Sequence, residues 1–399
     1  CAGRRWRSRQ ASRHWSRFVR PCHYRADRQV YDVDFAEQLK TTEVVDLVGV
    51  LDVGVMPNAD WQSCGTDAPE EPPATVPCIH AVLLDRSSPG AVLQPLVSAA
   101  QHWLSPPFPS REATRDALIS YMATALGNDR LAAEFCLFAL IARIHQRRPG
   151  IALGSLSLNL SNVVAAGPGK AQLTEVLETL CPGVVSQSLA LSQLNDESAS
   201  LFPRSTDAGL QPGRLQLPDG TCVVVDEVAM GEGELKDAGV RNVRALASVL
   251  QQHTLPYAFP FSEFEFNTDL NVVVLSTGKT LLPADVQVPV RPETGAASLD
   301  MRTRTRAEPP TAAQLDAFRL FLLQARQAHC IIPESVSEYI QNDFVDRRQT
   351  NKEAYTQDDL QLRIGIARLL CASLGREQLD VDAYNRAKEL DEQRKARFP

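Results

Sequence analysis

The stretch CVVVDEVAMGEGEL, residues 222–235, decides the fold. Four consecutive apolar residues run directly into two acids, Asp226 and Glu227. This pattern is typical of a buried strand that ends in polar side chains, as the strands of parallel sheets do. Many ATPases use adjacent acids at such a strand end to hold a magnesium ion and polarise a water. The stretch therefore predicts an α/β core and raises the question whether this chain hydrolyses a nucleotide.

The residues around this strand alternate between strand and helix patterns, which favours an α/β layer with a mostly parallel sheet. The strand patterns cover residues 156–161, 222–227, 271–276 and 286–290, and the helix patterns between them cover 171–180 and 240–253.

Helices are predicted on both sides of this layer. Ser110 can cap a helix over residues 111–126, and Asp129 can cap an apolar helix over 130–148 that Pro149 and Gly150 end. The region after residue 310 predicts further helices near 312–328, 333–343, 356–374 and 380–395.

The segment before the helices predicts a small β module. Residues 30–33, 44–51 and 78–85 have strand patterns, and Gly49 marks a bulge or bend. Short strands with long connections fit an OB-type barrel. Such barrels often bind single-stranded nucleic acid, but these strands carry acids where a phosphate backbone needs cations. Those acids are Asp32, Asp34, Glu43, Asp46 and Asp52.

Composition excludes several classes of protein. The net charge of −7 argues against non-specific binding of nucleic acid over the whole surface. Nine scattered cysteines contain no Cys-x-x-Cys pair, which argues against structural zinc and a disulfide framework and favours a reducing compartment, cytosol or nucleus. No apolar run is long enough for a membrane helix.

The first 29 residues are rich in Arg and Ser and begin with Cys rather than Met. Their composition fits either a mitochondrial transit peptide or translated non-coding sequence in a fragmentary gene model, and the second reading is favoured. We expect five regions: residues 1–29 outside the fold, an OB-like module over 30–104, a helical entry and α/β core over 105–292, a linker over 293–310, and helices over 311–399.

A phosphate-binding loop would lie between the strand at 156–161 and the helix at 171. The sequence NVVAAGPGKAQL, residues 162–173, places Gly167, Gly169 and Lys170 at the end of such a loop. However, Val164 occupies the place of the first Gly, and Ala171 replaces the hydroxyl that would ligate magnesium. Taken in order, the residues indicate an ATPase-like core that has lost catalytic parts.

A Gly-Lys-Thr triplet within residues 276–280 is a decoy. Val273 occupies the place of the first Gly, and Pro283 prevents the helix that should follow. We expect Ser276 to end a strand beside Asp226, where ATPases place a polar sensor residue. For each of these residues, an ordinary α/β core with polar strand ends remains the alternative.

With these segments together, the sequence resembles the minichromosome maintenance (MCM) complex-binding protein family. The matching segments include residues 30–53, 78–85, 125–148, 153–161, 213–253, 270–285, 341–349 and 356–394, within a resemblance over 29–396. The family's usual opening domain has no counterpart in this sequence.

The resemblance implies an MCM-like architecture: an OB-like module, a degenerate AAA+-like core of the P-loop type, and a helical lid. It also implies a non-catalytic nuclear protein that binds MCM subunits and supports DNA replication and sister-chromatid cohesion. In MCM helicases an arginine after a lid threonine reaches the γ-phosphate, whereas Thr356 is followed here by Gln357 and Asp358. A carboxylate at that place repels a triphosphate.

We therefore expect a nuclear adaptor or chaperone, not an enzyme, that assembles, holds or unloads MCM complexes and reaches chromatin through them. The alternative is a residual nucleotide-binding protein or slow ATPase that uses Lys170, Asp226 and Glu227; a single-strand nucleic-acid binder is a third. We expect no cofactor, no metal, no direct nucleic acid and no membrane. The remnants of the nucleotide site are Gly167, Gly169, Lys170, Asp226, Glu227 and Ser276, and the candidate partner surface is Glu43, Asp46, Arg241 and Arg244.

Overall fold

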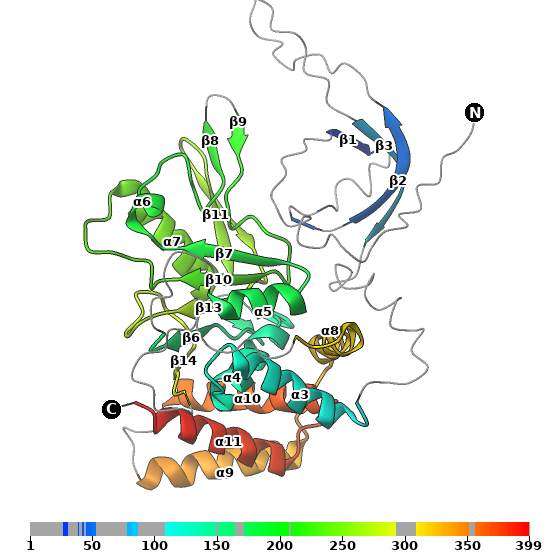
Figure 1. Cartoon of the computed structure of the whole chain (residues 1–399), viewed down its shortest axis with the longest axis vertical. Coiled ribbons are helices and arrows are strands. Elements are labelled where there is room, and N and C mark those ends of the chain that lie inside the picture. Colours follow the sequence, from blue (N-terminus) through cyan, green and yellow to red (C-terminus); the bar gives the residue numbers. More distant parts are fainter. Residues whose placement is uncertain are drawn as a thin grey trace, which may run out of the picture. The chain divides into compact units, whose positions relative to one another are not determined.

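The computed structural model divides into two compact units, residues 1–92 and 93–399 (Figure 1). The described residues are 27–30, 39, 42–43, 45–52, 78–86, 108–148, 151–163, 171–206, 209–292, 309–350 and 356–398. The expected linker over 293–310 lies outside them except for its last two residues.

The first unit contains a three-stranded sheet in the order β1-β3-β2, formed by β1 (Asp27–Val30), β2 (Val45–Asp52) and β3 (Cys78–Arg86). The predicted irregularity at Gly49 is confirmed, because the register between β2 and β3 shifts there. A Cβ at Gly49 would lie 2.2 Å from the carbonyl oxygen of His80, so only glycine allows this approach. Among the described residues of this unit the strands form no closed barrel. The boundary expected at residue 30 falls inside β1, and residues 31–33, predicted as strand, lie outside the described part.

The second unit is built around five parallel strands in the order β14-β6-β13-β10-β7, which cross its middle in Figure 1. They are β6 (Leu158–Ser161), β7 (Val184–Ser188), β10 (Cys222–Asp226), β13 (Asn271–Leu275) and β14 (Val286–Pro289). The parallel α/β core predicted from the sequence is confirmed.

Side chains of β10 alternate between two hydrophobic cores. Val224 belongs to the larger core, whereas Val223 and Val225 belong to the smaller one. The larger core holds α3 (Arg111–Thr124), α4 (Arg130–Ile141) and α5 (Gln172–Leu180), and the smaller core holds α7 (Asp237–Gln251) and the short α6 (Leu191–Leu194). Because both faces of the sheet are covered, the central strands β10 and β13 are nearly continuous apolar runs.

The predicted caps of α3 and α4 are confirmed: the side chain of Ser110 accepts from the N–H of Ala113, and that of Asp129 from the N–H of Ala132. The prediction that the second helix continues to residue 148 is wrong, since α4 ends at residue 141. The Asn271 amide donates to the carbonyls of Ala139 and Ala142 at 2.6 and 2.8 Å and so satisfies the helix end.

After α4 the chain forms a hairpin of β4 (Gln146–Arg148) and β5 (Ile151–Leu153). A second sheet, which the sequence analysis did not predict, has the order β12-β11-β8-β9. Its strands are β8 (Arg204–Thr206), β9 (Gly209–Gln211), β11 (Thr254–Ala258) and β12 (Glu263–Asn267).

The C-terminal helices are confirmed as α8 (Ala312–Gln327), α9 (Glu334–Thr350), α10 (Gln357–Leu374) and α11 (Val381–Lys395). Only α9 differs, because it extends seven residues beyond the expected end at 343. α8 packs on α3, α4 and α5, while α9, α10 and α11 lie together at the bottom of Figure 1.

Candidate functional site

The carboxyl ends of β6, β13 and β10 bring three of the predicted site residues to one edge of the sheet. Asp226 ends β10 opposite Leu275 of β13, and Glu227 and Ser276 follow these two strands. β13 lies between β10 and β6, so Ser276 lies between the acids and the connection that follows β6. Gly167, Gly169 and Lys170, in that connection, lie outside the described residues.

The side chain of Ser276 is held in the protein interior by hydrogen bonds. Its side chain is buried, and its hydroxyl donates to Oδ1 of Asn159 at 2.9 Å and lies 3.1 Å from the carbonyl oxygen of Gly278. Its backbone N–H donates to Leu160 and its carbonyl accepts from Val163, both at 3.0 Å. The hydroxyl therefore joins β13 to β6 and holds the start of the next loop.

Glu227 organises the same loop. Its Oε1 accepts a hydrogen bond of 2.6 Å from the N–H of Leu281, and its own N–H donates to the carbonyl of Leu275 at 3.0 Å. Its Oε2 is buried and has no hydrogen-bond partner among the described residues. One carboxylate oxygen thus has a structural role, and the other is left unsatisfied.

The Gly-Lys-Thr triplet at 278–280 lies in a loop, because no helix occurs between β13 and β14, a segment described throughout. The triplet is therefore a decoy, as predicted. At the other candidate loop, Ala171 occupies the N-cap position of α5 and makes no side-chain hydrogen bond. The start of α5, which is the described part of this loop, therefore has no side-chain cap and no hydroxyl at residue 171.

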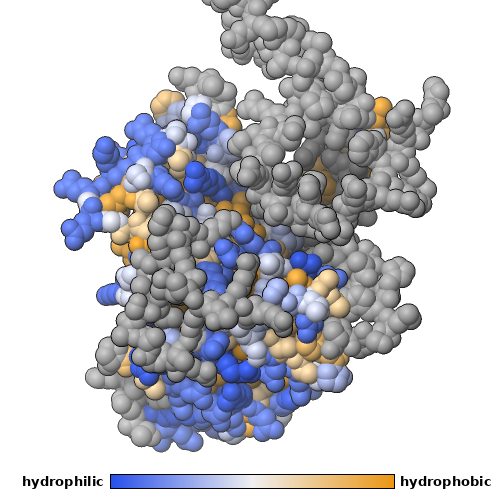
Figure 2. All heavy atoms as spheres, viewed as in Figure 1, coloured by the Kyte–Doolittle hydropathy of each residue, from blue (hydrophilic) through white to orange (hydrophobic). Residues whose placement is uncertain are grey.

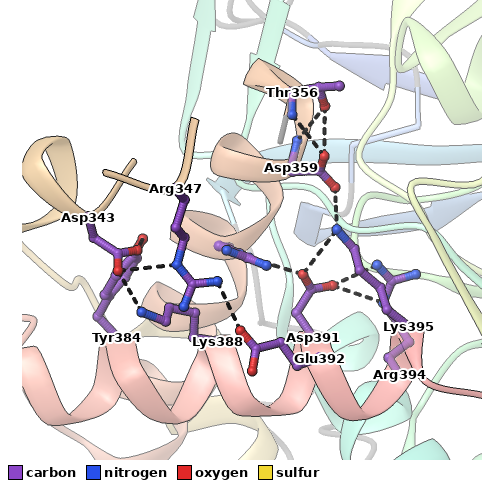
Figure 3. A network of polar contacts seen from close by, with 11 residues as sticks. Asp343, Arg347, Thr356, Asp359, Tyr384, Lys388, Asp391, Glu392, Arg394 and Lys395 are labelled. Carbon is purple, nitrogen blue, oxygen red and sulfur yellow. Dashed lines mark hydrogen bonds and ion pairs between the residues drawn. The ribbon is translucent and has the colours of Figure 1, made fainter. Parts of the chain in front are cut away.

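Thr356, after which the family resemblance places a lid arginine, caps α10 (Figure 3). Its N–H donates to Oδ2 of Asp359 at 3.0 Å, and its hydroxyl accepts from the N–H of Asp359 at 3.2 Å. Lys395 of α11 donates to Oδ1 of Asp359 at 2.6 Å. Burial alone would raise the pKa of Asp359, but the hydrogen bonds from Lys395 and Thr356 outweigh it and lower the pKa to about 2. This position is a helix cap tied to α11.

Figure 3 also shows how α11 is fixed to α10, and a further hydrogen bond fixes it to the sheet. The buried carboxylate of Asp391 accepts from Arg363 at 3.0 Å and from Arg394 at 2.6 Å. Arg394 also donates to the carbonyl of Gln287 in β14 at 3.2 Å. Sequence reasoning missed this network, because nothing in the spacing of the charges indicates which of them face inward.

The candidate partner residues fall on both units. Glu43 is half-buried and makes a polar or electrostatic contact, and Asp46 stands opposite Asp85 in the β2–β3 pair. Arg241 and Arg244 are exposed on α7, where they line a groove of about 440 Å³. Glu263 and Glu265 of β12 line the same groove. The sequence analysis did not identify these two glutamates.

Over the described ranges no group of three or more His, Cys, Asp or Glu side chains could hold a metal ion. Nor does any helix in the described part of the chain combine the length and apolar character needed to cross a membrane. Five cysteines of the second unit are free thiols, and burial raises the pKa of two of them, Cys136 and Cys181, to about 12.

Comparison with known proteins places the chain in a family. Residues 28–398 match the family model described as mini-chromosome maintenance replisome factor. The chain is 30% identical to the mini-chromosome maintenance complex-binding protein of Salmo salar over 86% of this chain and 55% of that protein. It is 28% identical to the Homo sapiens protein of that name over 90% and 59%, and 30% identical to the Arabidopsis thaliana one over 93% and 62%. The chain thus spans between half and two thirds of the length of these relatives, and the match to the family model covers nearly all of it. The chain belongs to the mini-chromosome maintenance (MCM) complex-binding protein family.

Proposed function

We propose that this chain is a non-catalytic nuclear adaptor that binds MCM helicase subunits. In this role it assembles, holds or unloads MCM complexes, reaches chromatin through them, and supports DNA replication and sister-chromatid cohesion. The observation that carries the proposal is the family match over residues 28–398, together with relatives that are named for binding the MCM complex.

The order of the central sheet supports an AAA+-like core. β6, the first strand of the sheet along the chain, lies inside it between β14 and β13, and the acids of β10 lie one strand further on. A phosphate-binding loop after β6 would then lie at the same edge of the sheet as the sensor residue Ser276 and the acids Asp226 and Glu227. The bulged strand pair of the first unit is compatible with an OB-like module, which together with this core would give an MCM subunit's layout.

The use of the edge side chains supports a role without catalysis. The hydroxyl of Ser276 and one oxygen of Glu227 are engaged within the fold, and Ala171 lacks a metal-ligating hydroxyl. After Thr356, which caps α10, Gln357 and Asp358 stand where a lid cation would be. An MCM-shaped protein without phosphate chemistry could occupy a subunit face but could not complete a composite ATP site.

The alternative, residual nucleotide binding, has one observation in its favour. In the described part of the chain the carboxylate of Asp226 makes no hydrogen bond, so it is free to hold a magnesium ion. We expect Mg–ATP to bind no tighter than about millimolar, an affinity of about 4 kcal/mol. Micromolar binding by isothermal titration would favour the alternative.

Affinity capture tests the adaptor role. The tagged chain is incubated with nuclear extract treated with nuclease, and the bound proteins are identified by mass spectrometry against a tag-only control. MCM subunits should be enriched with and without Mg–ATP, and nuclease should leave them bound. Capture without enrichment of any MCM subunit would overturn the proposal.

A further inference from the structure

Among the described residues, β12 is an edge strand whose outer backbone groups pair with no further strand. It stands at the end of the order β12-β11-β8-β9 and pairs antiparallel with β11. The N–H of Thr268 donates to the carbonyl of His253, and the N–H of Phe259 donates to the carbonyl of Ser262. These two hydrogen bonds show which residue pairs of β11 and β12 are hydrogen-bonded and which are not. Because bonded and non-bonded pairs alternate in an antiparallel ladder, the backbone groups of every second residue of β12 point away from β11. These residues are Glu263, Glu265 and Asn267.

The side chains of β12 form one aromatic and one acidic face. All five residues are exposed, with Phe264 at 56% and Phe266 at 42%. Phe266 packs on Tyr257 with ring centroids 4.3 Å apart, and Phe264 packs edge-on against Phe259 at 5.7 Å. These contacts fix the rings, and Phe261 at the turn of the hairpin is fully exposed. On the face in Figure 2, hydrophobic side chains are interspersed among hydrophilic ones.

The glutamates of the acidic face form no ion pair within the described residues. Glu263 and Glu265 stand opposite Ala258 and Pro256, which carry no charge. Arg241 and Arg244 lie across the groove, and within the described ranges no ion pair joins them to these glutamates. A strand added beside β12 would lie about 4.8 Å from it, so its side chains would be the nearest neighbours of the two glutamates.

β12 carries charged side chains but lacks the other devices that usually protect an edge strand from pairing. Such strands are protected by proline, lysine, bulges or very short length. β12 has five residues in regular register with β11 and contains neither proline nor lysine. Its two glutamates would repel a second copy of this strand, since identical strands pair acid beside acid. A basic partner strand would not meet this repulsion.

We propose that β12 is a docking edge for an extended segment of an MCM subunit, which adds to the sheet as a further strand. The segment alternates apolar and basic side chains: the apolar ones cover Phe264 and Phe266, and the basic ones pair with Glu263 and Glu265. Backbone hydrogen bonds give such strand addition its affinity, and alternate side chains give its specificity. The inference rests on the proposed binding of MCM subunits and adds the surface through which it occurs.

The test measures the affinity of the full chain for individually purified MCM subunits by biolayer interferometry. Glu265→Pro removes an outward N–H and leaves the ladder to β11 intact, because residue 265 belongs to a non-bonded pair. Glu265→Ala is the matched control, which loses the same charge but keeps the N–H. We expect Glu265→Pro to weaken binding about tenfold or more, and Glu265→Ala to weaken it by no more than about threefold. The double change Glu263→Lys with Glu265→Lys should weaken binding about tenfold and reverse its salt dependence.

The outcomes separate this inference from the proposed function. Wild-type chain that binds no MCM subunit would overturn both. Wild-type binding that all variants retain would overturn the docking edge alone, and so would self-association of the chain that Glu265→Pro abolishes while MCM binding persists. Should Glu265→Pro melt below the wild type, the charge-reversed variant decides the matter, and retained affinity in that variant contradicts the proposal.

Discussion

Replacing Ser276 with alanine tests whether its hydroxyl stabilises the fold or serves as a nucleotide sensor. The hydroxyl donates to Oδ1 of Asn159, a fully buried residue whose Nδ2 has no partner among the described residues. Alanine leaves the whole amide unpaired, and an orphaned buried acceptor costs about 1–3 kcal/mol. We therefore expect Ser276→Ala to lower the free energy of unfolding by about 1–3 kcal/mol. With a urea m-value of about 3 kcal/mol/M, the midpoint falls by about 0.3–1 M.

Urea unfolding followed by far-ultraviolet circular dichroism measures this change, because every described helix lies in the second unit. Ser335→Ala, on the exposed surface of α9, is the matched control and should stay within about 0.5 kcal/mol. Adding Asn159→Leu should recover part of the loss, since replacing both partners by apolar groups is nearly neutral. A loss below about 0.5 kcal/mol with strictly additive double-mutant energies would refute the reasoning.

Three other predictions concern the lid helices and the acids. Asp391→Asn leaves the buried guanidinium of Arg363 without a counter-charge, so thermal unfolding should show a loss of about 3–5 kcal/mol; a loss under about 1 kcal/mol would contradict the network. Because the pKa of Asp359 is lowered to about 2, its contribution is complete above its ordinary pKa of 3.8 and is lost as the pH falls toward 2. Melting temperatures of Asp359→Asn should therefore fall less than those of the wild type between these pH values, and parallel curves would refute this. The double change of Asp226 to Asn and Glu227 to Gln should leave MCM binding unchanged in pull-down assays, because Gln keeps the acceptor for the N–H of Leu281. Loss of MCM binding would show that the two acids take part in partner recognition.

The core of the second unit could be predicted from sequence because its elements carry strong local signals. The apolar run at 222–225 and the side-chain caps at Ser110 and Asp129 each specify their element without help from tertiary contacts. The end of α4 could not be predicted this way. It depends on the amide of Asn271, more than 120 residues away in the chain.

The candidate site was only partly predictable. The ends of the predicted strands place Asp226 and Ser276 at one edge of the sheet. The hydrogen bond from the Ser276 hydroxyl to Asn159 could not be predicted, because it depends on which strands become neighbours. The second sheet was missed although Glu263–Asn267 alternates acidic and aromatic residues, a period of two that predicts a strand.

The most direct test of an adaptor without catalysis is co-sedimentation of the purified chain with purified MCM subunits, with and without Mg–ATP. Analytical ultracentrifugation reports the complex, and phosphate release reports hydrolysis by the chain alone. The account predicts a complex of equal affinity in both conditions and no hydrolysis above background. A complex that forms only with ATP, or ATP turnover by the chain in the absence of MCM subunits, would contradict it.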